Sequence, residues 1–192
     1  MQLRSPRTVW RARGFSLVEV MVALLVISIG LLGIAKMQAL ALSNTSGARL
    51  RALAALEAAG LAATMQADRN YWSAITATTT ATVTTGAVTA ASDATLKTTV
   101  VCMKGAASSA APCNVSQMAG YDLQQWATDL QGVLGNGANA ASVTCNTATA
   151  TDPVSCMITI NWTESQVNTN SVEAGGNNAA LTNPSYTLFV DP

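Results

Sequence analysis

The strongest structural signal in the sequence is RARGFSLVEVMVALLVISIGLLGIAKMQ, residues 11–38. From Phe15 to Ala35 the chain runs through 21 residues in which Glu19 is the only charged one. As a helix, with a rise of about 1.5 Å per residue, this run spans about 31 Å, enough to cross the hydrocarbon core of a bilayer. A carboxylate within hydrocarbon costs roughly 3 kcal/mol on insertion scales, so we expect Glu19 to have a specific role.

The charge of the chain is unevenly distributed, although its formal total is zero. Residues 1–14 contain four of the ten basic residues, and the rest of the chain has six basic residues against ten acidic ones. Because cytoplasmic flanks of membrane helices are rich in Lys and Arg, this bias places residues 1–14 in the cytoplasm and the remainder outside. The acidic remainder lacks the basic face that nucleic-acid binding needs, so we expect no nucleic-acid partner.

Two boundaries compete as processing sites. Ala39-Leu40-Ala41 would suit signal peptidase, and cleavage there would release a soluble periplasmic protein. That reading makes the apolar region longer than an ordinary secretory signal and leaves Glu19 without a role. The other boundary lies between Gly14 and Phe15, ahead of the apolar run, and would keep this run in the mature protein.

The stretch RGFSLVEV, residues 13–20, resembles the class III signal of type IV prepilins. The resemblance implies that a membrane aspartyl prepilin peptidase cuts after Gly14 and that the new terminal residue, Phe15, is N-methylated. Phe15 would then carry an ammonium group one helical turn before Glu19. A carboxylate and an ammonium attract each other far more strongly in low dielectric than in water.

Glu19 can therefore pair with the Phe15 ammonium of its own chain or of a neighbouring subunit, and so set the register of helix packing. It would also lie in the first turn of the helix, where the helix dipole favours an anion. The alternative is a Glu19 side chain that reaches the lipid headgroups without a protein partner.

Helical character persists beyond Ala35. Leucines recur near helical spacing from Leu42 to Leu61 and are followed by Met65. We predict one long helix over residues 15–69, with 15–35 in the membrane and the second half packed on a soluble head formed by residues 70–192. The alternative is a separate amphipathic helix on a sheet. The stretch SNTSG, residues 43–47, is a poor helix former and is expected to bend or loosen the rod.

The first part of the head carries weak signals. Residues 71–96 are rich in Thr and Ala and lack large apolar side chains, so we interpret them as a variable connector between helix and sheet. The stretch TTVVCMKG, residues 98–105, suggests a short strand.

Stronger signals follow from residue 116. SQMAGYDLQQWATDLQGVLGNG predicts a helix with Ser116 as N-cap and Gly135 just after its end. We expect Trp126 in the core, on an apolar face made of Met118, Leu123, Trp126, Leu130, Val133 and Leu134. Two strands around a turn at Asp152-Pro153 come next, and YTLFVDP, residues 186–192, predicts a last strand.

The four cysteines, Cys102, Cys113, Cys145 and Cys156, form two pairs whose members are 11 positions apart. An even count in an exported chain indicates disulfides. Three pairings are possible, and we favour the two local ones, each of which would contribute about 3 kcal/mol by constraining the unfolded chain. Four reduced cysteines in a cytoplasmic protein are the alternative.

A second resemblance lies in the head. YDLQQW, residues 121–126, and INWTE, residues 160–164, are similar to the PilV family of minor pilins. The resemblance implies an α+β type IV pilin fold, in which a long amino-terminal helix packs on a small antiparallel sheet with one short extra helix. One departure from major pilins is Lys36, which stands where they commonly have a kinking Pro.

For function, the resemblance implies a minor pilin that initiates or supports type IV pilus assembly. Its implied partners are prepilin peptidase, other minor pilins, the major pilin, the inner-membrane assembly platform and, before assembly, membrane lipid. The implied location is the inner membrane, crossed once with the head in the periplasm, and then the pilus. A pseudopilin of a type II secretion system and a membrane-anchored binding module that does not polymerise stay open as alternatives.

Enzymatic chemistry has little support in the sequence. The chain has no histidine, which excludes Ser-His-Asp and Cys-His arrangements. The carboxylates outside the apolar run are scattered singly and suggest no acid/base pair. We expect no enzyme activity, no cofactor and no metal site.

Overall fold

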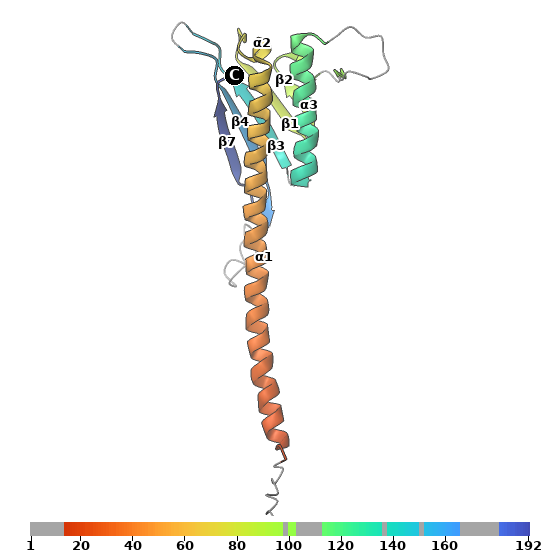
Figure 1. Ribbon diagram of the computed structural model, residues 1–192, viewed down its shortest axis with the longest axis vertical. Coiled ribbons are helices and arrows are strands. Elements are labelled where there is room, and N and C mark those ends of the chain that lie inside the picture. Colours follow the sequence, from red (N-terminus) through yellow and green to blue (C-terminus); the bar gives the residue numbers. More distant parts are fainter. Residues whose placement is uncertain (1–13, 98–99, 103–112, 136–137, 150–151, 166–180) are drawn as a thin grey trace, which may run out of the picture. The chain divides into compact units, whose positions relative to one another are not determined.

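The computed structural model describes residues 14–97, 100–102, 113–135, 138–149, 152–165 and 181–192. The chain divides into two compact units, Met1–Leu42 and Ser43–Pro192. In chain order the elements are α1 (Leu17–Ala67), α2 (Arg69–Trp72), β1 (Thr79–Thr84), β2 (Ala87–Ala91), the 3-10 helix η1 (Ala94–Lys97), α3 (Val115–Leu134), β3 (Ala138–Cys145), β4 (Cys156–Trp162), β5 (Glu164–Ser165), β6 (Leu181–Thr182) and β7 (Ser185–Val190) (Figure 1).

Helix α1 is one continuous element of 51 residues, as the sequence predicted, and it ends two residues before the expected boundary. It stays helical through Ser43–Gly47, where we expected a loosened segment. Ala- and Leu-rich sequence on both sides favours the helix. Gly47 itself meets a close neighbour, because a Cβ built there would lie 3.3 Å from Oε2 of Glu164. This glycine therefore serves the packing of the head.

Within the unit Ser43–Pro192, α1 buries a narrow stripe of side chains against the head. Its members, Ala54, Ala58, Leu61 and Met65, follow one another at helical spacing and are at most 2% exposed. Helix α3 adds Leu123, Leu130 and Trp126 to the same core. The indole N–H of Trp126 donates to the backbone carbonyl of Glu57 at 3.0 Å and so joins α3 to α1. The predicted core role of Trp126 is confirmed.

The core is closed by a five-stranded antiparallel sheet of order β2-β1-β3-β4-β7. Along β4, buried and half-buried positions alternate, as expected for a strand with one face on the core. β3 and β4 form the predicted pair, with Cys145 opposite Cys156. β7 is the predicted last strand and pairs with β4 along its whole length.

The interpretation of residues 71–96 as a connector is wrong. They hold the end of α2, the strands β1 and β2, and η1, and β1 lies inside the sheet between β2 and β3. Thr79, Ala81 and Val83 face the core from β1, which shows that small side chains suffice where the helices supply the large ones. The turn at Thr85 and Gly86 has φ values of 51° and 75°, the positive pair that a tight two-residue hairpin loop requires. The predicted order placed a connector between the long helix and α3. The structure places the two strands β1 and β2 there instead.

The bounds of α3 also differ from the prediction. Its N-cap is Asn114 and not Ser116. The Asn114 side chain accepts from the backbone N–H of Gln117 at 2.8 Å, and the Gln117 side chain accepts from the backbone N–H of Asn114 at 3.0 Å, which makes a reciprocal capping box. Gly135 ends the helix as predicted. Val133 is 37% exposed and so lies off the predicted apolar face.

The strand expected over residues 98–105 is not found where the structure describes that stretch, because residues 100–102 have no regular structure. The other residues of this expected strand lie outside the described part of the chain.

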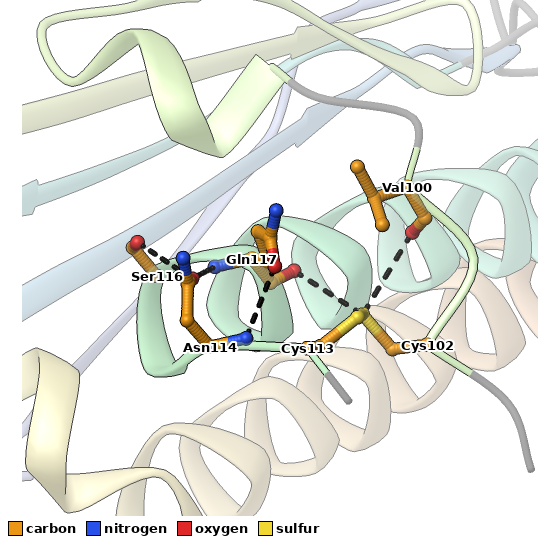
Figure 2. Close-up of a disulfide and its surroundings, with 6 residues drawn as sticks. All are labelled: Val100, Cys102, Cys113, Asn114, Ser116 and Gln117. Carbon is orange, nitrogen blue, oxygen red and sulfur yellow. Dashed lines mark hydrogen bonds between the residues drawn. A yellow bond between two sulfur atoms is a disulfide. The ribbon is translucent and has the colours of Figure 1, made fainter. Parts of the chain in front are cut away.

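Two disulfides cross-link the head, and both are local. Cys145 and Cys156 join β3 to β4 and are at most 1% exposed. Cys102 and Cys113 are half-buried, and the disulfide between them lies at the amino-terminal end of α3 (Figure 2). Figure 2 shows this second bridge beside the first turn of α3, where the Cys102 sulfur lies 3.7 Å from the carbonyl oxygen of Gln117.

The difference in burial predicts a difference in reduction. Exchange needs a reductant to reach a sulfur atom, so the half-buried bridge should open first. We expect a small phosphine reductant followed by alkylation to label Cys102 and Cys113 in the folded protein, with Cys145 and Cys156 labelled only on unfolding. Peptide mass spectrometry over a time course measures both. Simultaneous labelling of the two pairs without unfolding would contradict the expectation.

Candidate functional site

The segment from Phe15 to Ile34 presents apolar side chains on every side of the helix. Each of its large apolar residues is at least 49% exposed, and Phe15 is 83% exposed. The mean hydropathy of its most apolar window is 2.7. A helix that is apolar on all sides is stable in lipid or packed among other helices, because exposure of its apolar surface to water is unfavourable.

The predicted processing residues lie together at the start of this helix. Gly14 and Phe15 lie three and two positions before Leu17, the first residue of α1, and Glu19 is the acidic residue of its first turn. The backbone N–H of Glu19 donates to the carbonyl of Ser16 at 3.0 Å. Further along, the hydroxyl of Ser28 donates to the carbonyl of Leu24 at 2.7 Å, so this polar group is satisfied within the helix.

A second group of polar side chains, which the sequence did not predict, lies in the head. Glu164 is only 5% exposed and accepts hydrogen bonds from Arg51 on α1 and Trp162 on β4. The two bonds from Arg51 are 3.1 Å at Nε and 3.0 Å at Nη2, a bidentate pair, and the indole N–H of Trp162 donates at 2.9 Å. We call Arg51, Trp162 and Glu164 the head clamp, because it ties α1 to the end of the sheet.

The head clamp holds the Glu164 carboxyl in its ionised form. Hydrogen bonding from Arg51 is the main cause that lowers the pKa of Glu164, and the bond from Trp162 adds to it against the effect of burial. A sequence signal for half of this group existed. Trp162 is the last residue of β4, and Glu164 follows it two positions later, so in extended chain the two side chains point to the same face. A buried Trp162 therefore implies a buried Glu164, and a buried carboxylate needs a partner. Nothing in the sequence identified Arg51, 113 positions away, as that partner.

Acidic side chains also gather between α1 and α3. Burial, followed by the neighbouring charge of Asp122, raises the pKa of Asp68, and burial raises the pKa of Asp122 as well. Burial, and then the charge of Asp129, raises the pKa of Glu57. Among the described residues, no group of three or more His, Cys, Asp or Glu side chains is arranged to hold a metal ion, and these acidic side chains form no such group.

Comparison with known proteins locates the functional signal in the amino-terminal segment. Residues 11–35 match the family model described as the prokaryotic N-terminal methylation motif, and the match includes Gly14, Phe15 and Glu19. Searches of curated proteins and of solved structures gave no match. The motif supports a type IV pilin-like protein.

The architecture agrees with that class. A long amino-terminal apolar helix, packed from Ser43 onward on a five-stranded antiparallel sheet with additional short helices, fits the α+β type IV pilin fold. The motif implies processing by prepilin peptidase and contacts with pilus components. Together with the apolar helix it suggests an inner-membrane anchor. Proteins with this motif are typically structural and not catalytic.

Proposed function

We propose that this protein is a minor pilin of the PilV type, which initiates or supports type IV pilus assembly in a complex with other minor pilins. The observation that carries the proposal is the methylation motif at residues 11–35, which includes the start of α1, where the large apolar side chains from Leu17 to Ile34 are all exposed. YDLQQW and INWTE in the head support the minor-pilin assignment within the class.

The proposed processing follows from the charge and the motif. Residues 1–14 are a leader that stays in the cytoplasm because of its arginines. Prepilin peptidase cuts between Gly14 and Phe15, and Phe15 becomes N-methylated. Residues 15–69 then make up the segment that contains the long helix α1. Of this segment, residues 15–35 lie in the lipid of the inner membrane before assembly, and residues 70–192 form the periplasmic head. After assembly the subunit is part of the pilus at the cell surface.

Assembly rests on two physical terms. When helices lie side by side, their apolar surfaces leave the lipid and contact one another, and the van der Waals contacts of close packing stabilise the assembly. The carboxylate of Glu19 pairs with the ammonium of Phe15, on the same chain or on the neighbouring subunit, and this pairing sets the register. The major pilin and the inner-membrane assembly platform are the remaining proposed partners.

A pseudopilin of a type II secretion system is the second candidate, because the methylation motif supports it equally. A strain that lacks this protein distinguishes the two. Loss of surface pili with normal protein secretion supports the minor pilin, and loss of secretion with normal pili supports the pseudopilin. An anchored module that does not polymerise would leave both intact.

Mass spectrometry of the native mature protein tests the processing. We expect an amino-terminal N-methylated Phe15 with residues 1–14 absent, because the peptidase recognises the Gly14 boundary. A mature terminus at Leu42 would show cleavage by signal peptidase, and an intact Met1 would show no processing. Either result would remove the basis of the filament proposal.

A further inference from the structure

Strand β7 forms one edge of the five-stranded sheet, where it is the outermost strand in Figure 1. It pairs with β4 in a regular register, from Asn161 opposite Ser185 to Cys156 opposite Val190. Alternate residues of an edge strand direct their backbone N–H and C=O groups away from the sheet. Within the part of the chain that the structure describes, no hydrogen bond reaches β7 from any element other than β4. The outer side of β7 therefore offers a row of backbone groups to another strand.

The opposite edge, strand β2, is occupied by helices. α3 and η1 pack on β2, and the backbone N–H of Val88 donates to Oε1 of Gln124 on α3 at 3.4 Å. The register between β1 and β2 also shifts between Thr82 and Val83. A covering helix and a bulge are devices that prevent a sheet edge from pairing with another chain. The β2 edge is therefore closed to strand addition.

Strand β7 has none of these devices. Its sequence, SYTLFV, contains no charged residue and no proline, and Pro184 and Asp191 mark its two ends. Phe189 is 71% exposed, which makes it the most exposed large apolar side chain among the described residues of the head unit. It lies opposite the half-buried Met157 on the outer face of the sheet. A strand added to β7 would cover Phe189, because cross-strand side chains lie about 5 Å apart.

A second copy of this chain does not fit the β7 edge within one membrane. Copies that share one orientation would bring β2 of one copy beside β7 of the next, and β2 is closed. Two copies that join their β7 edges antiparallel would turn the Ser43–Ala67 segments of α1, which run along the sheet in Figure 1, in opposite directions. Chains anchored in one membrane through α1 share one direction. The β7 edge therefore fits a strand from a different chain.

We propose, on the basis of the proposed function, that β7 accepts an edge strand of a different pilin subunit. The added strand extends the sheet through main-chain hydrogen bonds along Ser185–Val190 and packs an uncharged side chain against Phe189. In strand addition, main-chain hydrogen bonds supply affinity and the side chains supply specificity. Because the β2 edge is closed, the head accepts a neighbouring strand on one side of its sheet and does not build a continuous sheet of its own copies.

The test is co-purification of the full chain from native membranes in detergent, with the recovered pilins identified by mass spectrometry. Phe189→Lys places a charge where the added strand would pack. It should reduce recovery of the partner pilin at least about fivefold, the factor that corresponds to about 1 kcal/mol. Hydrogen exchange reports on the backbone. A peptide that covers Ser185–Val190 should take up less deuterium in the native complex than in the protein alone.

Thr144→Lys is the matched control. Thr144 lies opposite Met157, which lies opposite Phe189, so the same charge enters the same cross-strand row on the inner strand β3. We expect native recovery for this variant, and thermal unfolding shows whether each variant is folded. Exchange of β7 in the native complex tests the inference even if Phe189→Lys does not fold.

Three results would overturn the inference: undiminished recovery with a folded Phe189→Lys, unchanged exchange of β7 in the native complex, or a second copy of this chain as the partner. Each of these leaves the proposed minor-pilin function standing. Recovery of no other pilin by the native protein would contradict both the inference and the proposed function.

Discussion

Replacement of Glu19 by Ala is expected to leave cleavage after Gly14 largely intact and to reduce incorporation of the subunit into pili or minor-pilin complexes by at least about tenfold. The reason is electrostatic. In the proposed assembly the Phe15 ammonium lies in an apolar environment, and removal of its partner leaves it buried without compensation. Insertion into the membrane depends on the apolar run, which the substitution lengthens, so the membrane level of the subunit should not fall.

Two further variants separate charge from shape. Glu19→Gln keeps the size and loses the charge, and should behave like Glu19→Ala. Glu19→Asp keeps the charge on a shorter side chain and should retain part of the incorporation. Immunoblots of sheared pili and co-purification with other pilins, both normalised to the amount in the membrane, measure the effect. Undiminished incorporation of Glu19→Ala and Glu19→Gln would remove the proposed role of this acid.

The head clamp carries the second large effect. Glu164→Ala should lower the free energy of unfolding of the head by about 1–3 kcal/mol, because it leaves the buried indole N–H of Trp162 without an acceptor. The melting temperature should fall by several degrees. Glu164→Gln keeps an oxygen for Trp162 and loses only the ionic contact with Arg51, which is 63% exposed and can be solvated. We therefore expect a clearly smaller loss for Glu164→Gln in denaturant titrations.

The pH dependence of this difference has a defined sign. The folded-state pKa of Glu164 is lowered, so its ionic contribution is present above the unfolded pKa of about 4.3 and is lost as the pH falls through the folded value. Glu57, Asp68 and Asp122 have raised pKa values and act in the opposite direction, since their contribution is lost as the pH rises. The gap between native protein and Glu164→Gln should therefore be full at neutral pH and close in acid. A gap that stays constant with pH would show that the clamp is not ionic.

Sequence reasoning succeeded where one pattern extends over many residues. The apolar run from Phe15 to Ala35 has no other reasonable structure than a helix, and the Ala- and Leu-rich residues after it continue that helix. The β3–β4 pair was recoverable from two cysteines that lie on either side of the expected turn at Asp152-Pro153. In these regions local preference and tertiary packing agree.

It failed where tertiary packing chose between weak local preferences. β1 and β2 are made of Thr, Ala and Val, and their strands are stabilised by neighbours that the local sequence does not reveal. The N-cap of α3 was missed because Asn114 and Ser116 are both suitable and only the contact with Gln117 decides. Arg51 and Glu164, like Tyr71 and Asp93, are brought together by folding across long separations, and a single sequence holds no record of such pairs.

The stripe of Ala54, Ala58, Leu61 and Met65 has a practical consequence for work in water. A fragment that starts after α1 would expose the inner face of the sheet and lose Arg51 as well. A fragment that starts at Ser43 would remove the exposed apolar part of α1 and keep both Arg51 and the buried stripe. The natural place to divide this polypeptide is therefore inside a helix.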